Sequence, residues 1–221
     1  MFLSILAAAA VFTTPSADVH VAMEVNEKLP AWVSRQHNWT AAELEVFADP
    51  TGRVLTCKVR RFVPLQDVAD EMCKVLIGRQ VVPAKNFDDE ESYGLGLMIV
   101  VVDEDGKSDL ASRLGDLQQD GIVLTVGSLP ESFRETPETR VPLNLEIGTG
   151  GEVLRCDGSK DVPEAFREVA CNHASAKSFD VRIGANGGAV PYVRNFDIVF
   201  EPGPYVDGRG GGPAPHSHGQ G

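Results

Sequence analysis

The sequence lacks the short motifs that carry the common enzyme chemistries. Its 221 residues contain no Gly-x-Ser-x-Gly nucleophile turn, no His-Glu-x-x-His zinc motif, no phosphate-binding glycine loop and no acidic calcium loop. The four cysteines show no Cys-x-x-Cys spacing, which argues against a structural zinc site. From these absences we predict a non-catalytic protein with no catalytic residue, no cofactor and no metal ion.

Positive charge is also scarce. The chain has 20 Lys and Arg residues against 32 Asp and Glu residues, which gives a formal net charge of −12. Because a basic surface supplies the affinity for nucleic acids and anionic membranes, this composition argues against both as partners. The apolar run from Met1 to Phe12 is too short for a membrane-spanning helix, so we expect no stable membrane span.

The N-terminus lacks one part of an export signal and has the others. No Lys or Arg precedes Lys28, so the usual positive start is missing. The apolar run is followed by Pro15, Ser16 and the small residue Ala17, a pattern typical of a signal peptide that is cleaved after Ala17. We predict a signal peptide over residues 1–17 with an atypical n-region, and therefore a periplasmic or secreted protein. A buried N-terminal strand or helix is the alternative.

The feature that organises the chain is an internal repeat with a period of about 99 residues. A hexapeptide from Gly52 to Cys57 returns from Gly151 to Cys156 with the same glycine, Val-Leu pair and cysteine. In each copy an apolar strand precedes the glycine turn, and a helical run and a long apolar strand follow the cysteine. A repeat of this length exceeds a solenoid unit and indicates duplicated domains.

The repeat predicts an α+β fold of two tandem small domains, each an antiparallel sheet of three to four strands with a helix packed on one face. We place the first domain at residues 29–102 and the second at residues 129–201. A helix-strand connector over residues 103–128 joins them, and its segment 122–126 is predicted to form a strand. The Gly-, Pro- and His-rich residues 202–221 cannot bury a core and are expected to be disordered.

The four cysteines occupy equivalent places in the two copies. In the first copy, alternation puts Leu55, Cys57 and Val59 on one strand face, and Cys73 lies on the apolar stripe of a helix expected over residues 65–78. The first copy therefore directs a strand cysteine and a helix cysteine into the same layer.

In the second copy, Leu154 and Cys156 are predicted to share a strand face, and Cys171 lies on a helix stripe. We therefore predict two disulfides, Cys57–Cys73 and Cys156–Cys171, each joining a helix to its sheet. Such disulfides are typical of an oxidising compartment and agree with export. Four reduced core cysteines are the alternative.

Each small sheet must end in strands with unpaired backbone groups unless the neighbouring unit covers them. The last strand of the first copy has no proline and is largely apolar, so we expect it to accept an extended segment of a partner. This candidate docking strand consists of Gly96, Leu97, Met98, Ile99, Val100, Val101 and Val102. In the alternative, the strand pairs with residues 122–126 or with the other copy and gives a closed body.

Each copy resembles the C-terminal domain of TonB-type energy transducers, in the cysteine-containing form of bacterial envelope proteins. In the first copy the resemblance rests on the strand from Gly52 to Val59, on Cys73 in the helix, on the stretch from Arg79 to Ala84 and on the strand from Gly96 to Val102. The second copy is similar through its hexapeptide and Cys171, and it is the more degenerate of the two.

The resemblance implies the fold of that domain, the absence of catalytic residues and the binding of an extended peptide beside an exposed strand. Transducers of this family also carry an inner-membrane helix and a long Pro-rich spacer, and neither occurs between Met1 and the first copy. We therefore expect a non-catalytic periplasmic binding or envelope-assembly protein, with a segment of an envelope or outer-membrane protein as its partner. A membrane-tethered transducer component with a helix upstream, and an exported enzyme with an unrecognised site, are the alternatives.

Overall fold

In the part of the chain that it describes, the computed structural model is a mixed α+β structure with a mainly sheet core and two helices, which confirms the α+β class. It describes residues 15, 29, 39–63, 66–103, 121–126 and 139–202. Apart from Pro15, the predicted signal peptide lies outside the described residues. The connector helix and nearly all of the C-terminal tail lie outside them as well.

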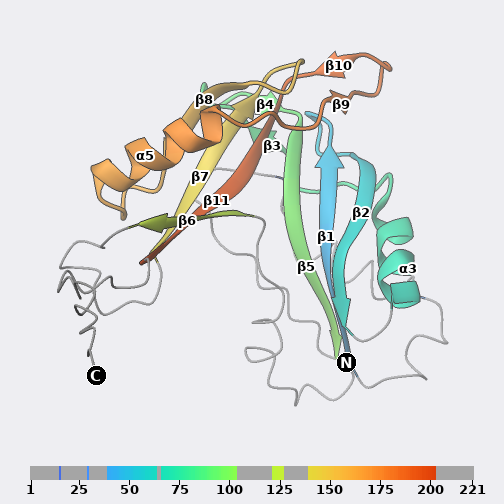
Figure 1. Cartoon of the computed structure of the whole chain (residues 1–221). Coiled ribbons are helices and arrows are strands. Elements are labelled where there is room, and N and C mark those ends of the chain that lie inside the picture. The colour runs from blue at the N-terminus through green and yellow to red at the C-terminus, as the bar shows by residue number, and fades with distance from the viewer. Residues whose placement is uncertain are drawn as a thin grey trace, which may run out of the picture.

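The two repeats fold with the same order of elements: a hairpin, a helix, two very short strands and a long final strand (Figure 1). The first repeat comprises β1 (Trp39–Ala48), β2 (Val54–Val63), α3 (Gln66–Leu76), β3 (Ala84–Lys85), β4 (Glu91–Ser92) and β5 (Gly94–Asp103). The second comprises β7 (Thr139–Ile147), β8 (Val153–Gly158), α5 (Glu164–Ser175), β9 (Arg182–Ile183), β10 (Ala189–Val190) and β11 (Tyr192–Pro202). Between them, β6 (Gly121–Val126) corresponds to the strand predicted in the connector.

The antiparallel sheets of the two repeats, β2-β1-β5 and β8-β7-β11, join into one sheet. Their final strands pair in parallel, Gly94 with Val193 and Leu95 with Arg194. With β6, which pairs in parallel with β11, the sheet has seven strands. The sequence leaves open whether the final strand of the first copy stays unpaired or pairs with the other copy, because local periodicity carries no information about pairing between distant strands. The structure shows that it pairs with the other copy at these two positions.

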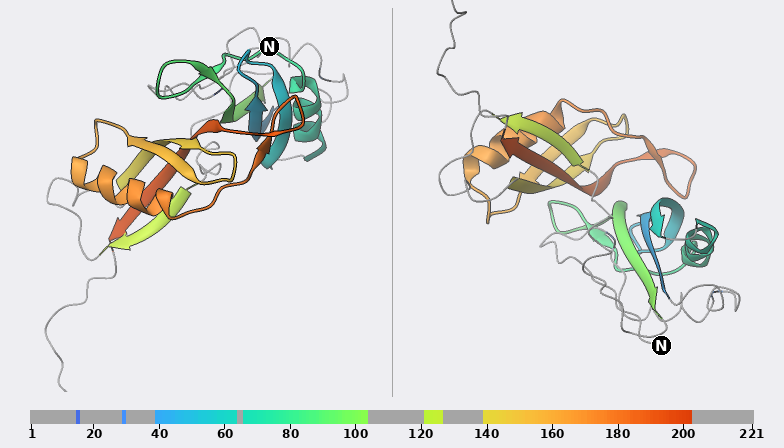
Figure 2. Two further views of the ribbon diagram at one scale, coloured as in Figure 1. Left: turned by 90° about the horizontal axis from the view of Figure 1, so that it is seen from above. Right: turned by 60° about the horizontal axis from the view of Figure 1, so that its bottom comes forward.

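The parallel junction places the two helices on opposite faces of the joined sheet. Even-numbered residues of β5, such as Met98, share a core with α3, and even-numbered residues of β11, such as Phe196, share a core with α5. Paired residues of neighbouring strands face the same side, and here even-numbered Gly94 pairs with odd-numbered Val193. Figure 2 shows the two helices well apart, one with each repeat.

Two hydrophobic cores follow from this arrangement. The first lies between α3 and its three strands, and Leu29, from the segment before β1, packs against it. The second lies between α5 and its strands and also includes Phe47 and Leu95 from the first repeat. The second core therefore continues across the junction of the repeats and holds them together by apolar burial.

The second strand of the first repeat contains a β-bulge that corrects a sequence prediction. Phe47 lies opposite Thr56, whereas the next residue, Ala48, lies opposite Val54, so Leu55 is an extra residue in β2. Leu55 is predicted on the same face as Cys57, but Val54 takes that place in the first core and Leu55 packs against the second. Strict alternation fails where a residue is inserted.

The second repeat repeats the bulge. Glu146 lies opposite Arg155 and Ile147 lies opposite Val153, which leaves Leu154 as the extra residue. The prediction that Leu154 shares the face of Cys156 is wrong for the same reason, and 53% of Leu154 is exposed.

The repeated glycine of each hairpin is required by its backbone. Gly52 and Gly151 have φ angles of +86° and +87°, which side chains strongly disfavour. The Val81 and Phe179 amides donate hydrogen bonds of 2.8 Å to the Gly52 and Gly151 carbonyls, respectively. A Cβ atom on either glycine would lie 2.1 Å from the carbonyl oxygen of that same partner. The hairpin turn is therefore fixed to the chain that follows the helix.

A disulfide joins each helix to the second strand of its repeat, with the pairing expected from the repeat. Cys57 is bonded to Cys73 and Cys156 to Cys171, with Cα–Cα distances of 5.3 and 5.7 Å. In the first repeat the helix carries its apolar stripe on one side, namely Val68, Ala69, Met72, Cys73 and Leu76. The disulfide thus reinforces a contact that hydrophobic packing already defines.

A buried carboxylate lies on the face of β11 opposite α5. The Asp197 side chain is 7% exposed and accepts a hydrogen bond of 2.9 Å from Nη1 of Arg140 on β7. Burial raises the pKa of the Asp197 carboxyl above its usual value, and the Arg140 guanidinium opposes this increase.

This shift predicts a pH dependence of stability. The folded-state pKa of Asp197 exceeds the unfolded value near 3.8, so the folded state binds a proton on this carboxyl more tightly than the unfolded state does. The free energy of unfolding therefore falls as pH rises from the unfolded pKa through the folded pKa. The D197N variant lacks this proton, so its free energy of unfolding should increase relative to the wild type from about pH 4 upwards and then level off. Urea titrations at a series of pH values measure this difference. A difference that does not change with pH contradicts the assignment.

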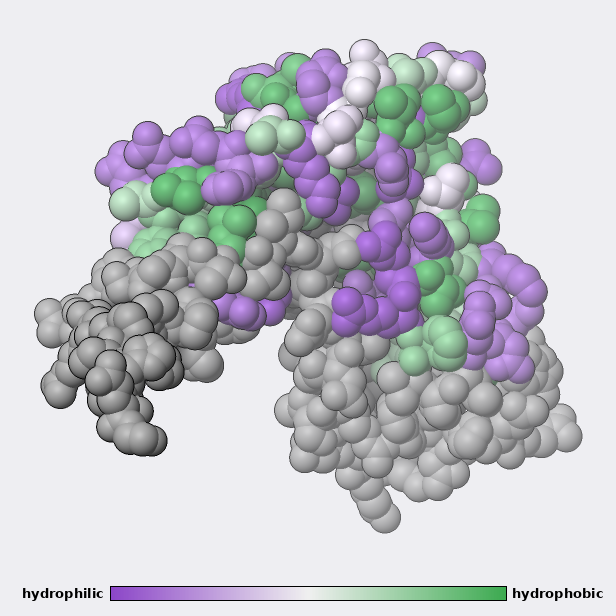
Figure 3. Space-filling view, in the orientation of Figure 1, coloured by the Kyte–Doolittle hydropathy of each residue, from purple (hydrophilic) through white to green (hydrophobic). Residues whose placement is uncertain are grey.

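On the face shown in Figure 3, the exposed apolar side chains of the described residues do not form one continuous surface. Figure 3 shows them in several separate patches with hydrophilic residues between them. Residues such as Phe62, Ile77 and Leu154 are more than a third exposed and come from different elements. On this face, side-chain hydrophobicity alone does not mark a docking surface.

Candidate peptide-binding edge

The predicted docking strand lies in β5, and its two sides differ. One side pairs with β1 along the whole strand, from Gly94 opposite Ala48 to Asp103 opposite Trp39. The other side meets β11 only at Gly94 and Leu95. From Gly96 onwards, no strand among the described residues pairs with that side. We call this side of the stretch from Gly96 to Val102 the open edge.

The direction of the backbone groups follows from one hydrogen bond at the junction. The Val193 amide donates to the carbonyl of Tyr93 at 3.0 Å, so the Tyr93 carbonyl points towards β11. Backbone groups of successive residues in a strand point to opposite sides. The amides and carbonyls of Leu97, Ile99 and Val101 therefore point to the open edge, and those of the even-numbered residues point to β1.

The side chains of this stretch are largely packed inside the protein. Met98 and Val100 belong to the first core, with 6% and 3% of their surfaces exposed. Leu97 and Ile99 on the other face are half-buried. The open edge thus offers a row of backbone donors and acceptors beside apolar side chains, which is the arrangement that strand addition uses.

Three aromatic rings fix the point where β5 meets β11. The Phe47 ring stacks on Tyr93 with centroids 5.8 Å apart and meets Tyr192 edge-on at 6.0 Å. The Tyr192 hydroxyl donates a hydrogen bond of 2.9 Å to the carbonyl of Asp180. Burial raises the pKa of this hydroxyl above its usual value, which keeps it protonated and a donor at neutral pH.

A buried ionic cluster lies beside these rings. The Glu45 carboxylate, 7% exposed, contacts Nη2 of Arg182 from the second repeat at 2.7 Å and Nη1 of Arg60 at 3.3 Å. The Arg182 guanidinium also lies 5.9 Å from the centroid of the Phe47 ring. Sequence reasoning missed this cluster. The feature that could have indicated it is a glutamate on a strand whose neighbours are mostly apolar, because such a carboxylate is buried only when it is paired.

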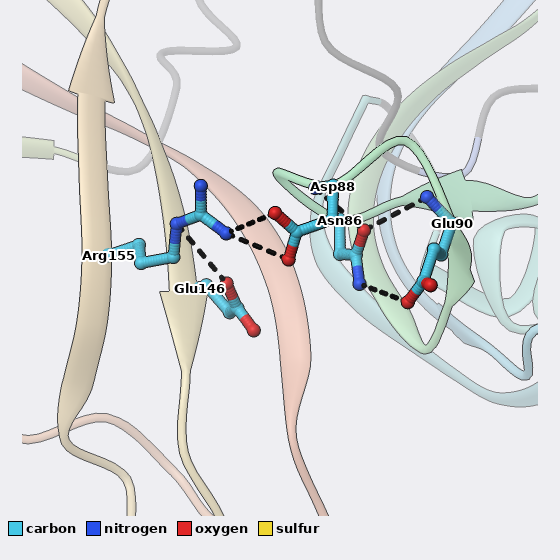
Figure 4. A network of polar contacts seen from close by, with 5 residues as sticks. All are labelled: Asn86, Asp88, Glu90, Glu146 and Arg155. Carbon is cyan, nitrogen blue, oxygen red and sulfur yellow. Dashed lines mark hydrogen bonds and ion pairs between the residues drawn. The ribbon is translucent and has the colours of Figure 1, made fainter.

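A second ion pair between the repeats lies at the surface (Figure 4). Nη1 of Arg155 donates to both carboxylate oxygens of Asp88 at 2.9 Å, and its Nε lies 4.0 Å from Glu146. Asn86 shapes the loop, because its side-chain oxygen accepts from the amides of Asp88 and Glu90. Sequence reasoning missed this pair too, since nothing local connects residues of different repeats.

The contacts between the repeats are reciprocal. The β3–β4 hairpin of the first repeat reaches β8 of the second through Asp88, and the β9–β10 region of the second reaches β1 of the first through Arg182. Each repeat therefore contributes the same structural element to hold the other.

No group of three or more His, Cys, Asp or Glu side chains that could hold a metal ion occurs among the described residues. In the same part of the chain, no helix is long and apolar enough to cross a membrane. Comparisons with protein-family models, curated proteins and solved structures give no match to the chain. The features of the described residues that bear on function are therefore the β5 edge and the contacts around it.

Proposed function

We propose that the protein is a non-catalytic TonB C-terminal-like envelope protein of the periplasm, which binds an extended segment of another envelope protein as an added strand on β5. Its two disulfides support an oxidising compartment. The open backbone edge from Gly96 to Val102 supports the mode of binding.

The observation that carries the proposal is the pairing of β6 with β11. Residues of β5 and β11 correspond with an offset of about 98, so Met98 matches Phe196 in the two cores. Beyond its contact with β5, β11 pairs in parallel with β6 from Asp197 to Pro202. The corresponding part of β5 begins at Ile99 and has no described partner on that side. On β11, the strand β6 thus occupies the position that has no described partner on β5.

This correspondence defines the expected ligand. It should run parallel to β5, as β6 runs parallel to β11, and should be similar in length to β6, which has 6 residues. The second repeat does not offer the same edge, because β7 occupies one side of β11 and β5 and β6 occupy the other. Binding is therefore assigned to the first repeat alone.

A proline at Ile99 should abolish peptide binding. The Ile99 amide points to the open edge, so proline removes a donor that the added strand needs and leaves the β1 ladder intact. The probe is a fluorescent peptide that carries the β6 sequence between flanking lysines, and anisotropy with the full chain measures its affinity. We expect I99P to bind at least about tenfold more weakly than the wild type.

The I99V variant is the matched control, because it keeps the amide and nearly the same side chain, and it should bind as the wild type does. Unchanged binding by a folded I99P variant would refute strand addition at β5. A wild-type protein that binds neither this probe nor any extended peptide from a library of periplasmic and outer-membrane sequences would favour a structural role.

A further inference from the structure

The core face of β5 begins with two glycines. Gly94 and Gly96 share that face with Met98 and Val100, where large apolar side chains would be expected. Glycine in a strand interior weakens the strand and often marks a place where another backbone approaches closely. We call these two residues the glycine platform.

Pro15 lies directly on the glycine platform and is buried there. A Cβ atom on Gly94 would lie 2.6 Å from Cδ of Pro15 and 2.3 Å from Cβ of Ala84. A Cβ atom on Gly96 would lie 2.5 Å from the carbonyl oxygen of Pro15. Neither position can therefore carry a side chain while Pro15 is in place.

The second repeat has no such platform. With the offset of 98, Gly94 corresponds to Tyr192 and Gly96 to Arg194. Tyr192 is fully buried in the second core, and the Arg194 guanidinium lies 4.9 Å from the centroid of the Phe179 ring. The second repeat fills this place with its own side chains, whereas the first repeat receives Pro15 from outside the repeat.

We propose that the glycine platform is a binding site for a proline side chain, which Pro15 occupies within the same chain. Proline fits the platform because its ring is compact and it has no amide that burial would leave without an acceptor. This site lies on the face of β5 and is distinct from the backbone edge assigned to strand addition. The cleavage predicted after Ala17 would remove Pro15 and make the platform available to a proline of another chain.

Occupation within the chain predicts competition. A tethered segment has an effective concentration in the millimolar range, so it excludes a free peptide that binds more weakly than that. The P15D variant of the full chain should vacate the platform, because a carboxylate buried without a partner is strongly disfavoured. The probe is a fluorescent peptide with the sequence of residues 11–18, Val-Phe-Thr-Thr-Pro-Ser-Ala-Asp.

We expect this probe to bind P15D at least about tenfold more tightly than the wild-type full chain, measured by anisotropy. A probe with aspartate in place of its proline should not bind. Adding G96A to P15D should abolish binding, and adding G188A should not, because a Cβ atom on exposed Gly188 would meet no atom closer than 3.5 Å.

Equal affinity of the probe for the wild type and P15D overturns the proposal, and so does equal affinity of the two probes for P15D. These two comparisons hold even if the G96A variant fails to fold. If I99P loses binding of the β6 peptide while the residue 11–18 probe binds the wild type and P15D equally, the platform proposal is rejected and strand addition at the β5 edge is retained.

Discussion

Replacing Glu45 by glutamine should lower the free energy of unfolding by about 3 kcal/mol, as expected when one partner of a buried ion pair is removed. The Glu45 carboxylate is 7% exposed, and Arg182, 18% exposed, contacts it at 2.7 Å. A second carboxylate near Arg182, that of Asp180, lies 3.9 Å away and is 91% exposed, so it gives little compensation. Denaturant unfolding measures the loss.

The D88N variant is the matched control for E45Q. It makes the same chemical change in the other ion pair between the repeats, but Asp88 and Arg155 are 65% and 45% exposed. Exposed pairs contribute about 1 kcal/mol or less, so D88N should be nearly neutral. Equal losses in the two variants would contradict the importance of burial at this junction.

Replacing Cys73 by serine should lower the free energy of unfolding by about 2 to 5 kcal/mol. The Cys57–Cys73 bond closes a loop with a sequence separation of 16 residues, for which the chain-entropy model gives roughly 3 kcal/mol. The C171S variant removes the equivalent bond, with a separation of 15, and should lose a similar amount. Thermal and urea unfolding of the oxidised proteins measure both.

Because the second core crosses the junction, both cysteine variants should shift one common unfolding transition. Separate transitions for the two repeats would contradict the joined sheet. Four free thiols in exported wild-type protein would contradict the disulfides themselves.

The features that could be predicted from the sequence are those set by local chemistry. The hairpin glycines, such as Gly52, need a positive φ angle, and this requirement is local to the turn. The helix that carries Cys73 shows its apolar stripe directly in the residue spacing. The pairing of Cys57 with Cys73 follows from the same two patterns and from their recurrence in the second repeat.

The features that could not be predicted depend on contacts between distant parts of the chain. Alternation gives the face of a residue only while the register holds, so the bulge at Leu55 moved that side chain from one core to the other. The pairing of Leu95 with Arg194 unites the sheets without any local signal. Pro15 is predicted as part of an export signal, and its close contact with Gly96 has no local signal in the sequence.

On the side away from β1, the backbone of β5 has no described partner beyond Leu95, and amide hydrogen exchange tests most directly whether this edge is open. NMR of the full chain should show slow exchange for the amides of Gly96, Met98 and Val100, which point to β1, and fast exchange for those of Leu97 and Ile99. Saturation with the β6 peptide should slow the fast set and leave the slow set unchanged. Uniform protection along β5 without the peptide would show that the edge is already covered and would contradict the account.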